Sequence, residues 1–140
     1  MKVTYRVSPS VKNRELNALF ASAWPSHRRR NLQPLLRRAL VYVCAYAGKE
    51  LVGFVKAVGD GGVHGFLLDP TVSPSQRRKG IGQRLVLKCA EEARRLGAEW
   101  LHVDFEPRLA KFYRACGFSL TTAGLRNLKA EKKPRRCGRG

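Results

Sequence analysis

Two glycines one residue apart, Gly80 and Gly82, stand where a strand-like run gives way to a helix-like run, and this junction constrains the fold most. Residues 64–72 have the composition of a strand, whereas residues 80–96 repeat apolar side chains at helical spacing. Glycine lets such a turn bring several backbone N–H groups together, and the start of a helix is already partially positive. A strand–turn–helix of this kind is an anion cradle, and phosphate is its natural ligand.

Two phosphate-binding motifs are absent from this turn, and their absence narrows the range of possible ligands. A P-loop needs a glycine, four residues and then Gly-Lys followed by Ser or Thr, and no such run is present. The dinucleotide fingerprint Gly-x-Gly-x-x-Gly fails because Leu85 stands where the third glycine belongs. What remains is Arg77-x-x-Gly80-x-Gly82, and two glycines in a basic turn, taken alone, are more often an ordinary helix start than a cofactor site.

A second motif lies downstream at residues 112–118, which read Phe-Tyr-Arg-Ala-Cys-Gly-Phe. The stretch between the two motifs has room for one helix, ended by Gly97, and one strand. In this order, the two motifs closely resemble the acyl-CoA loop and the fourth-helix signature of the GCN5-related N-acetyltransferases. The resemblance extends from Leu51 to Leu125, which is most of the chain.

The resemblance implies an α/β (α+β) fold around a central mixed, mostly antiparallel sheet of about six strands. Helices would cover both faces, and the fourth and fifth strands would splay apart to leave a V-shaped gap. It also implies acetyl-CoA as the co-substrate and no metal ion. We expect residues 1–128 to form the acetyltransferase domain and residues 129–140 to be a basic, disordered tail.

The cofactor contacts follow from the family residue by residue. Thr71 and Val72 would offer unpaired backbone to the pantetheine amides, as an added strand would. The diphosphate would lie on the turn, which consists of Arg77, Arg78, Lys79, Gly80, Ile81 and Gly82. Glu106 takes the place of the family's usual Asn, and Leu109 that of its usual Ala. Glu accepts a hydrogen bond but cannot donate one as Asn does, so the contact at Glu106 would differ.

Tyr113 is the catalytic residue that the resemblance implies. The reaction would be direct transfer of an acetyl group from a thioester to a primary amine, with Tyr113 protonating the departing sulfur. Reference pKa values of ~10 for tyrosine and ~8.5 for a thiol make that transfer slightly uphill, so its contribution falls toward the low end of roughly 10²–10⁴. From the residue alone, Tyr113 is equally a half-buried helix residue whose hydroxyl faces water.

No general base stands out. Phe66 occupies the strand position where several family members carry a base. His64, Asp69, Asp104 and Glu106 lie nearby, and a structural role for each is the simpler interpretation. A lysine acceptor, with a reference pKa near ~10.4, is almost fully protonated at neutral pH. The sequence therefore favours an acceptor amine that is partly neutral, or a base that acts through water.

Apolar spacing and chain breakers predict the remaining elements. Leu16, Leu19, Phe20 and Trp24 share one face of a helix that Pro25 ends. Asp69-Pro70 should interrupt its strand, because proline has no N–H to donate. The expected order is strand 3–7, helix 13–23, helix 33–39, strands 41–47, 51–58 and 64–72, helix 80–96, strand 100–105, and a closing strand 118–125.

The chain carries 28 Lys and Arg residues against 10 Asp and Glu residues, a formal net charge of +18. Arg84 and the basic turn suit an anionic cofactor, but the cofactor does not need the whole excess. Nucleic acid, a ribosome, an acidic substrate or a basic host proteome would explain the rest equally well. Two alternatives therefore stay open on this fold: a basic nucleic-acid-binding or ribosome-associated protein, and a non-catalytic acyl-CoA-binding module.

The acceptor is an amine on a small molecule or a protein, and the sequence does not choose between them. In the family the first two helices flank the acceptor's opening, and here a basic loop, residues 27–30, joins them. This loop is where substrate identity should be encoded, although a solvated charged loop explains it equally well.

Composition and cysteine usage give the remaining expectations. A length of 140 residues with 44% hydrophobic residues suits one domain. The four cysteines, Cys44, Cys89, Cys116 and Cys137, show no Cys-x-x-Cys spacing, which favours neither zinc nor disulfides. We expect a reduced, cytoplasmic chain with no membrane contact, because no stretch resembles a signal peptide or a membrane span. The oligomeric state, monomer or dimer, stays open.

Overall fold

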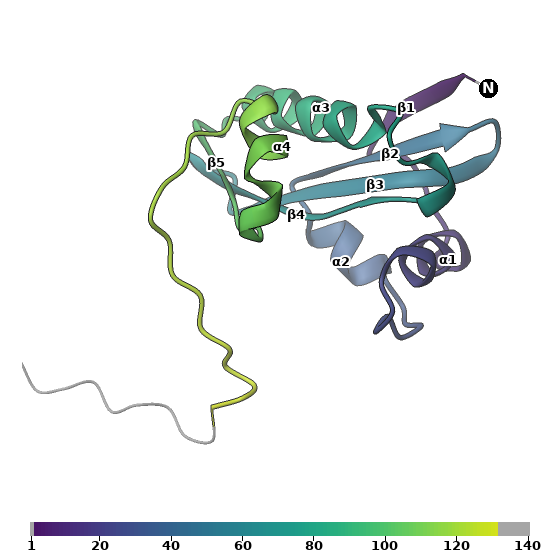
Figure 1. Ribbon diagram of the computed structural model, residues 1–140, viewed down its shortest axis with the longest axis horizontal. Helices are drawn as coiled ribbons and strands as arrows, with labels where there is room; N and C mark the ends of the chain where they lie inside the picture. Colours follow the sequence, from purple (N-terminus) through teal and green to yellow (C-terminus); the bar gives the residue numbers. More distant parts are fainter. Residues whose placement is uncertain (1, 132–140) are drawn as a thin grey trace, which may run out of the picture.

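The computed structural model describes residues 2–131. Its sheet has the strand order β1-β2-β3-β4-β5, with β1 at Val3–Val7, β2 at Val41–Ala47, β3 at Glu50–Gly59, β4 at His64–Val72 and β5 at Trp100–Val103. The neighbours from β1 to β4 are antiparallel, and β4 and β5 are parallel. The expected mixed, mostly antiparallel sheet is confirmed (Figure 1).

The helices of the described chain are α1 at Asn13–Ala23, α2 at Gln33–Arg38, α3 at Ile81–Arg95 and α4 at Ala110–Ala115. Two 3₁₀ turns, η1 at Pro74–Gln76 and η2 at Pro107–Leu109, come before α3 and α4. Figure 1 shows α3 and α4 on one face of the sheet and α1 and α2 on the other. Since strand side chains alternate between faces, the sheet separates two hydrophobic cores.

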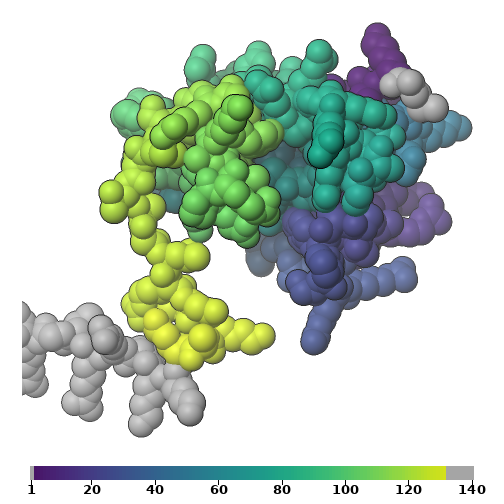
Figure 2. All heavy atoms as spheres, viewed as in Figure 1, coloured from purple at the N-terminus to yellow at the C-terminus, as the bar shows by residue number. Residues whose placement is uncertain are grey.

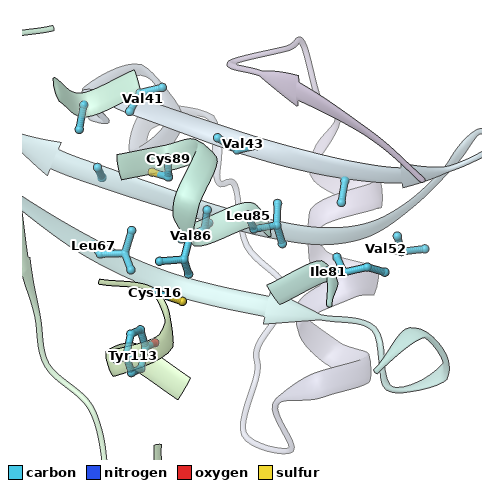
Figure 3. Packing of buried hydrophobic residues seen from close by; sticks show 14 of the residues in the cluster. Val41, Val43, Val52, Leu67, Ile81, Leu85, Val86, Cys89, Tyr113 and Cys116 are labelled. Carbon is cyan, nitrogen blue, oxygen red and sulfur yellow. The ribbon is translucent and has the colours of Figure 1, made fainter. Parts of the chain in front are cut away.

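The first core fixes where α3 begins. Ile81, Leu85 and Cys89 form its buried stripe against the sheet, as the apolar spacing predicted (Figure 3). Gly53 on β3 permits close contact, because a Cβ there would lie 2.8 Å from Leu85 Cδ1 and 3.3 Å from Ile81 Cγ2. Gly53 is also the register partner of Val72, so the start of α3 lies over the end of β4.

The second core holds α1 against the opposite face. Leu16, Leu19 and Phe20 are buried, as predicted, and pack with Phe54 of β3. The ring centroids of Phe20 and Phe54 lie 5.6 Å apart at an interplanar angle of 76°. The segment between α1 and α2 lies near Phe54 and Lys56 of β3 and Asp69 of β4.

β4 contains the expected interruption. Lys56 pairs with Leu68 and Phe54 pairs with Thr71, so two residues of β4, Asp69 and Pro70, oppose one residue of β3. This is a β-bulge, which bends a strand and re-aims its side chains. Asp69 has a φ of 58°, a left-handed conformation that Asp adopts more readily than most non-glycine residues.

The predicted gap between β4 and β5 begins just before the bulge. The two strands pair from His64 and Trp100 to Leu67 and Val103, where β5 ends earlier than expected. Residues 68–72 of β4 therefore have no strand beside them on the edge away from β3. The splayed arrangement that the sequence predicted is confirmed.

The closing strand expected at residues 118–125 is wrong, and the described sheet has five strands, not about six. After Gly117 ends α4, Phe118 still packs against the first core, but Leu120 and Leu125 are 49% and 85% exposed. The segment Thr121-Thr122-Ala123-Gly124 offers little apolar surface to bury against β5. The chain instead runs away from the body of the protein (Figures 1 and 2).

Two further expectations concern the disordered tail and the absence of a membrane span. Most of the tail expected to be disordered, residues 132–140, lies outside the described residues. Just before it, Arg126 Nη2 lies 2.6 Å from Glu131 Oε2. Within residues 2–131 no helix combines the length and apolarity needed to cross a bilayer.

Candidate active site

The turn before α3 has the geometry of an anion-binding nest. Gly80 is the N-cap of α3 with φ 78° and ψ 8°, and Arg78 also lies in the left-handed region at φ 66°. No side chain caps the helix, and its first backbone bond runs from the N–H of Arg84 to the carbonyl of Gly80 at 3.1 Å. The N–H groups of Ile81, Gly82 and Gln83 thus lack helical partners and suit an anion.

The charges around this turn agree with that assignment. Arg77, Arg78 and Lys79 are all available at the surface or rim of the turn, and the first turn of α3 contains no acidic residue. Lys79 Nζ donates to Gln76 Oε1 at 3.0 Å, an exposed contact. A Cβ placed on Gly80 would meet no atom within 4 Å, so the space in front of the turn is open.

Gly82 joins the turn to the gap and to α4. A Cβ at this position would lie 3.5 Å from the ring of Phe112 on α4 and 3.6 Å from Val72 Cγ2 at the end of β4. The predicted turn and the predicted fourth-helix motif are therefore in contact, although 30 residues separate Gly82 and Phe112 in the sequence.

The backbone of Val72 faces the gap, whereas that of Thr71 does not. The N–H of Ser73 donates to the carbonyl of Val52 at 2.8 Å, and the partners of an antiparallel pair alternate between bonded and non-bonded positions. Thr71 therefore bonds toward Phe54, and the polar groups of Val72 point away from β3. Of the two residues expected to offer unpaired backbone, only Val72 faces the gap, since Thr71 is buried and its Oγ1 donates to the carbonyl of Asp69 at 2.9 Å. The cofactor contacts of both residues stay predictions.

Tyr113 lies in an aromatic cluster on α4. Its ring stacks on Phe105 at a centroid distance of 4.6 Å and meets Phe112 and Phe118 edge to face at 5.0 and 5.8 Å. The side chain is buried, and burial raises the pKa of Tyr113 above its ordinary value, with the nearby Cys116 acting in the same direction. Tyr113, labelled in Figure 3, is thus a neutral phenol at physiological pH. It is held beside Gly82 through Phe112.

Glu106 and Leu109 lie where the sequence placed them, between β5 and α4. Glu106 is an exposed N-cap of η2, and its Oε2 accepts from Arg108 Nε at 2.7 Å. Leu109 packs against the first core. The contact between Glu106 and the cofactor stays a prediction, and the Glu106 carboxylate is already paired with Arg108.

The candidate bases lie in different places. Asp69 sits on the bulge at the gap, and its Oδ2 lies 3.3 Å from Lys56 Nζ. His64 Nδ1 contacts His102 Nε2 at 2.9 Å, at the end of β4 where the strands are still paired. Phe66 stacks on His102 at 4.5 Å. Among these side chains, the bulge brings only Asp69 to the gap and to the pocket described next.

A pocket of about 290 Å³ opens on the α1 and α2 face beside Asp69. α1, the following loop, α2, β3 and β4 all contribute to its lining, which includes Phe20, Trp24, Phe54, Lys56 and Asp69. Sequence reasoning missed Lys56, which is buried although it is charged. The sequence signal that could have identified Lys56 is a lysine within an otherwise apolar strand.

Asn17 is the second residue that sequence reasoning missed. It is buried, and its Nδ2 donates to the carbonyl of Arg30 at 2.8 Å. Its Oδ1 accepts from the N–H of Arg30 at 3.1 Å and contacts His27 Nε2 at 2.8 Å. The loop 27–30 is therefore fixed to α1 and forms part of the pocket wall, and is not simply solvated.

Neither a metal site nor a disulfide emerges from the described residues. Residues 2–131 contain no group of three or more His, Cys, Asp or Glu side chains placed to hold a metal ion. Cys44, Cys89 and Cys116 are buried free thiols, and Cys137 lies outside the described residues.

The sequence and the fold match known proteins over most of the chain. The model of the acetyltransferase (GNAT) family matches residues 12–118. GCN5-related N-acetyltransferase 1, chloroplastic, of Arabidopsis thaliana is 26% identical over 133 residues, covering 93% of this chain and 68% of the relative. Serotonin N-acetyltransferase 2, chloroplastic, of Oryza sativa subsp. japonica is 28% identical over 119 residues, covering 81% of this chain and 59% of the relative.

A solved structure of a GNAT-family protein is also similar to this one. An acetyltransferase of the GNAT family from Streptococcus pneumoniae TIGR4 superposes with a TM-score of 0.79 at 26% identity, covering 93% of this chain and all of that one. The expected cytoplasmic location stays a prediction, and both plant relatives are named chloroplastic. With the family model covering the gap, the nest before α3 and the α4 motif together, the chain belongs to the GNAT acetyltransferase family.

Proposed function

We propose that this protein is an N-acetyltransferase that moves an acetyl group from acetyl-CoA to a primary amine by direct attack. The amine nitrogen forms a bond to the thioester carbonyl carbon, and the carbon–sulfur bond breaks. The sulfur leaves as a thiol after taking a proton from Tyr113 Oη, and the one proton lost by the amine is transferred through solvent to the resulting phenolate, which restores Tyr113. The products are an acetamide and free coenzyme A.

The observation that carries the proposal is one continuous row of contacts. Val72, with its backbone facing the gap, lies against Gly82, Gly82 lies against Phe112, and Phe112 lies against Tyr113. An extended molecule with an anionic end and a reactive end is suited to such a row, because its anion meets the nest while its reactive end lies toward the tyrosine. Acetyl-CoA has this shape and charge.

The described residues fit acetyl-CoA on two independent grounds. The uncapped start of α3 offers free N–H groups with Arg77, Arg78 and Lys79 beside them, as a diphosphate requires. The free edge of β4 offers the N–H and carbonyl of Val72 to an amide, as the next strand of a sheet would. Bound there, acetyl-CoA would supply the activated acetyl group.

Orientation would provide most of the acceleration. Holding amine and thioester together in a near-attack geometry is worth up to about 7–11 kcal/mol. The raised pKa of Tyr113 keeps the phenol protonated but makes it a weaker acid, so its share belongs near the low end of roughly 10²–10⁴. The proposal therefore does not depend on a strong base in the described chain.

The acceptor class in this proposal is a primary amine. The family acts on amine-bearing substrates, and the rice relative is named for serotonin, which carries a primary amine. The opening on the α1 and α2 face brings such an amine to Asp69 at the gap, across the sheet edge from Tyr113.

The test is the release of coenzyme A from acetyl-CoA with a panel of amines, run beside the Tyr113→Phe variant. The proposal expects amine-dependent release that the variant slows without abolishing. A full-length protein that binds acetyl-CoA but releases none with any amine would contradict it.

That outcome would instead favour the second candidate, a non-catalytic acyl-CoA-binding module. The observation on its side is the ion pair of Glu106 with Arg108 at 2.7 Å, at the position where the family's usual Asn meets the cofactor.

A further inference from the structure

The pocket beside Asp69 has a mixed lining that selects among amines. Its apolar wall is aromatic: Phe20 and Trp24 stack at a centroid distance of 4.4 Å and an angle of 11°, and Phe54 closes the side toward the sheet. Leucines of α1 and α2 complete this wall. Such a surface binds a large apolar or aromatic group and gains little from a small polar one.

The charged part of the lining is basic. Arg28 and Arg30 stand on the loop at the rim, and Lys56 and Asp69 lie at the sheet. With three cationic side chains and a single carboxylate, the pocket favours a ligand that carries negative charge. An amine that carries no negative charge would gain only from the carboxylate of Asp69 and nothing from the three cations.

The loop that carries the two arginines is held in place. Asn17, buried on α1, binds both the N–H and the carbonyl of Arg30, and it also contacts His27. His27 packs edge to face on Phe20 at 5.5 Å. Because these contacts hold the loop backbone from two sides, the backbone of Arg28 and Arg30 has a fixed position at the rim of the pocket.

The pair of Lys56 and Asp69 is itself a receptor for a zwitterion. Lys56 Nζ and Asp69 Oδ2 are 3.3 Å apart, the lysine side chain is 9% exposed and the aspartate side chain is 41% exposed. An ammonium group can bind the open carboxylate while a carboxylate bonded to the same small molecule meets Lys56 and the rim arginines. Asp69 also lies on the bulge at the gap, so an amine bound there is next to the proposed thioester position.

On these grounds, and resting on the proposed function, we propose that the acceptor is an α-amino acid with an aromatic or large apolar side chain. Its side chain fills the space at Phe20 and Trp24, its carboxylate meets Lys56 with Arg28 and Arg30, and its amino group lies at Asp69. The amino nitrogen attacks the acetyl carbonyl, and the carbon–sulfur bond breaks. The products are an N-acetyl amino acid, coenzyme A and one proton.

The volume agrees with a small acceptor. About 290 Å³ is just below the roughly 300–1,000 Å³ typical of small-molecule pockets and suits one amino acid.

The test compares matched acceptors on the full-length protein. Phenylalanine and tryptophan are assayed against their decarboxylated amines, phenethylamine and tryptamine, and against alanine, which lacks the large side chain. The proposal expects kcat/KM at least tenfold higher for the aromatic amino acids than for either control class. Equal or higher values for the decarboxylated amines, or for alanine, would overturn it.

Rim variants separate recognition of the carboxylate from other effects. Arg28→Gln and Arg30→Gln should raise KM for phenylalanine about tenfold and leave KM for phenethylamine unchanged or lower. Arg29→Gln is the matched control, because Arg29 does not line the pocket. An equal effect of all three variants would contradict the assignment.

The outcomes also distinguish this inference from the proposed function. Turnover of other amines, with none of the aromatic amino acids, overturns the inference and leaves the acetyltransferase intact. Binding of acetyl-CoA without turnover of any amine overturns both.

Discussion

Phe112 on α4 packs over Gly82 at the start of α3, with a Cβ on Gly82 lying only 3.5 Å from the Phe112 ring. The two motifs that identify this chain from its sequence are thereby parts of one site. Val72 completes the contact from the sheet side at 3.6 Å. Any side chain larger than alanine at residue 82 must enter the space between α3, α4 and β4.

Gly82→Leu should therefore weaken acetyl-CoA binding. The added side chain displaces Phe112 or narrows the space beside Val72, and we expect the Kd to rise at least about tenfold, or roughly 1.4 kcal/mol. Helix propensity favours Leu over Gly, so the variant should stay folded. Calorimetric titration measures the effect.

Gly124→Leu is the control, because a Cβ at Gly124 meets nothing within 4 Å. Equal affinities for acetyl-CoA in both variants would show that the space at Gly82 is not part of the cofactor site.

Tyr113→Phe should lower kcat while KM for acetyl-CoA changes little. The variant removes a proton donor and keeps the ring that stacks on Phe105, so a loss near the low end of roughly 10²–10⁴ is expected. Tyr5→Phe makes the same chemical change on β1, at the far edge of the sheet from the gap, and should not alter kcat. Steady-state kinetics of coenzyme A release would refute the assignment if both variants matched the wild type.

Asn17→Ala should loosen the loop 27–30 and leave the cofactor site alone. The N–H and carbonyl of Arg30 lose their partner, and because both bonds are only partly buried the cost should fall below the about 1–3 kcal/mol of a fully buried unsatisfied group. We expect a lower melting temperature, faster hydrogen exchange in the loop and a higher KM for the acceptor with an unchanged Kd for acetyl-CoA. Faster exchange spread evenly over the chain, with no local maximum in the loop, would contradict this role.

Stability should fall as the pH rises above about 9. Burial raises the pKa of Cys44 and of Cys89 to about 12, from an ordinary 9.0. The folded state thus binds these protons more tightly than the unfolded state, so stability is complete below pH 9 and is lost toward pH 12. Each thiol contributes a slope of about 1.36 kcal/mol per pH unit within that window.

Urea unfolding between pH 8 and about 9, under reducing conditions, measures the onset of this slope before the tyrosines contribute, because their ordinary pKa is 10.0 and burial raises it. Cys89→Ala should reduce the slope by about a third to a half, whatever its effect on stability at neutral pH, because burial also raises the pKa of Cys116. An unchanged slope would mean that Cys89 is not protected from ionisation in the folded state.

The sequence was informative where a residue type has few uses. Glycine before a helix permits a left-handed turn, and proline in a strand has no N–H to donate, and Gly80 and the bulge at Asp69 lie where these properties predict. The buried stripe of α3 followed from apolar spacing in the same way. These features are local, so they need no knowledge of the partner segment.

Features that depend on a distant partner were missed or wrong. Thr71 and Val72 differ in direction because of the pairing phase set by the bulge, which the sequence does not reveal. The segment 118–125 has strand-like residues but no apolar face that β5 would bury. Asn17 and Lys56 are explained only by what lies across from them, the carbonyl of Arg30 and the carboxylate of Asp69.

The central claim is that the nest before α3 binds the diphosphate of coenzyme A. Calorimetric titration of the full-length protein with coenzyme A and with pantetheine, which lacks the diphosphate and nucleotide, tests it most directly. The account predicts that coenzyme A binds and that pantetheine binds at least about 100-fold more weakly, or roughly 2.7 kcal/mol. Equal binding of the two, or no binding of coenzyme A, would contradict it.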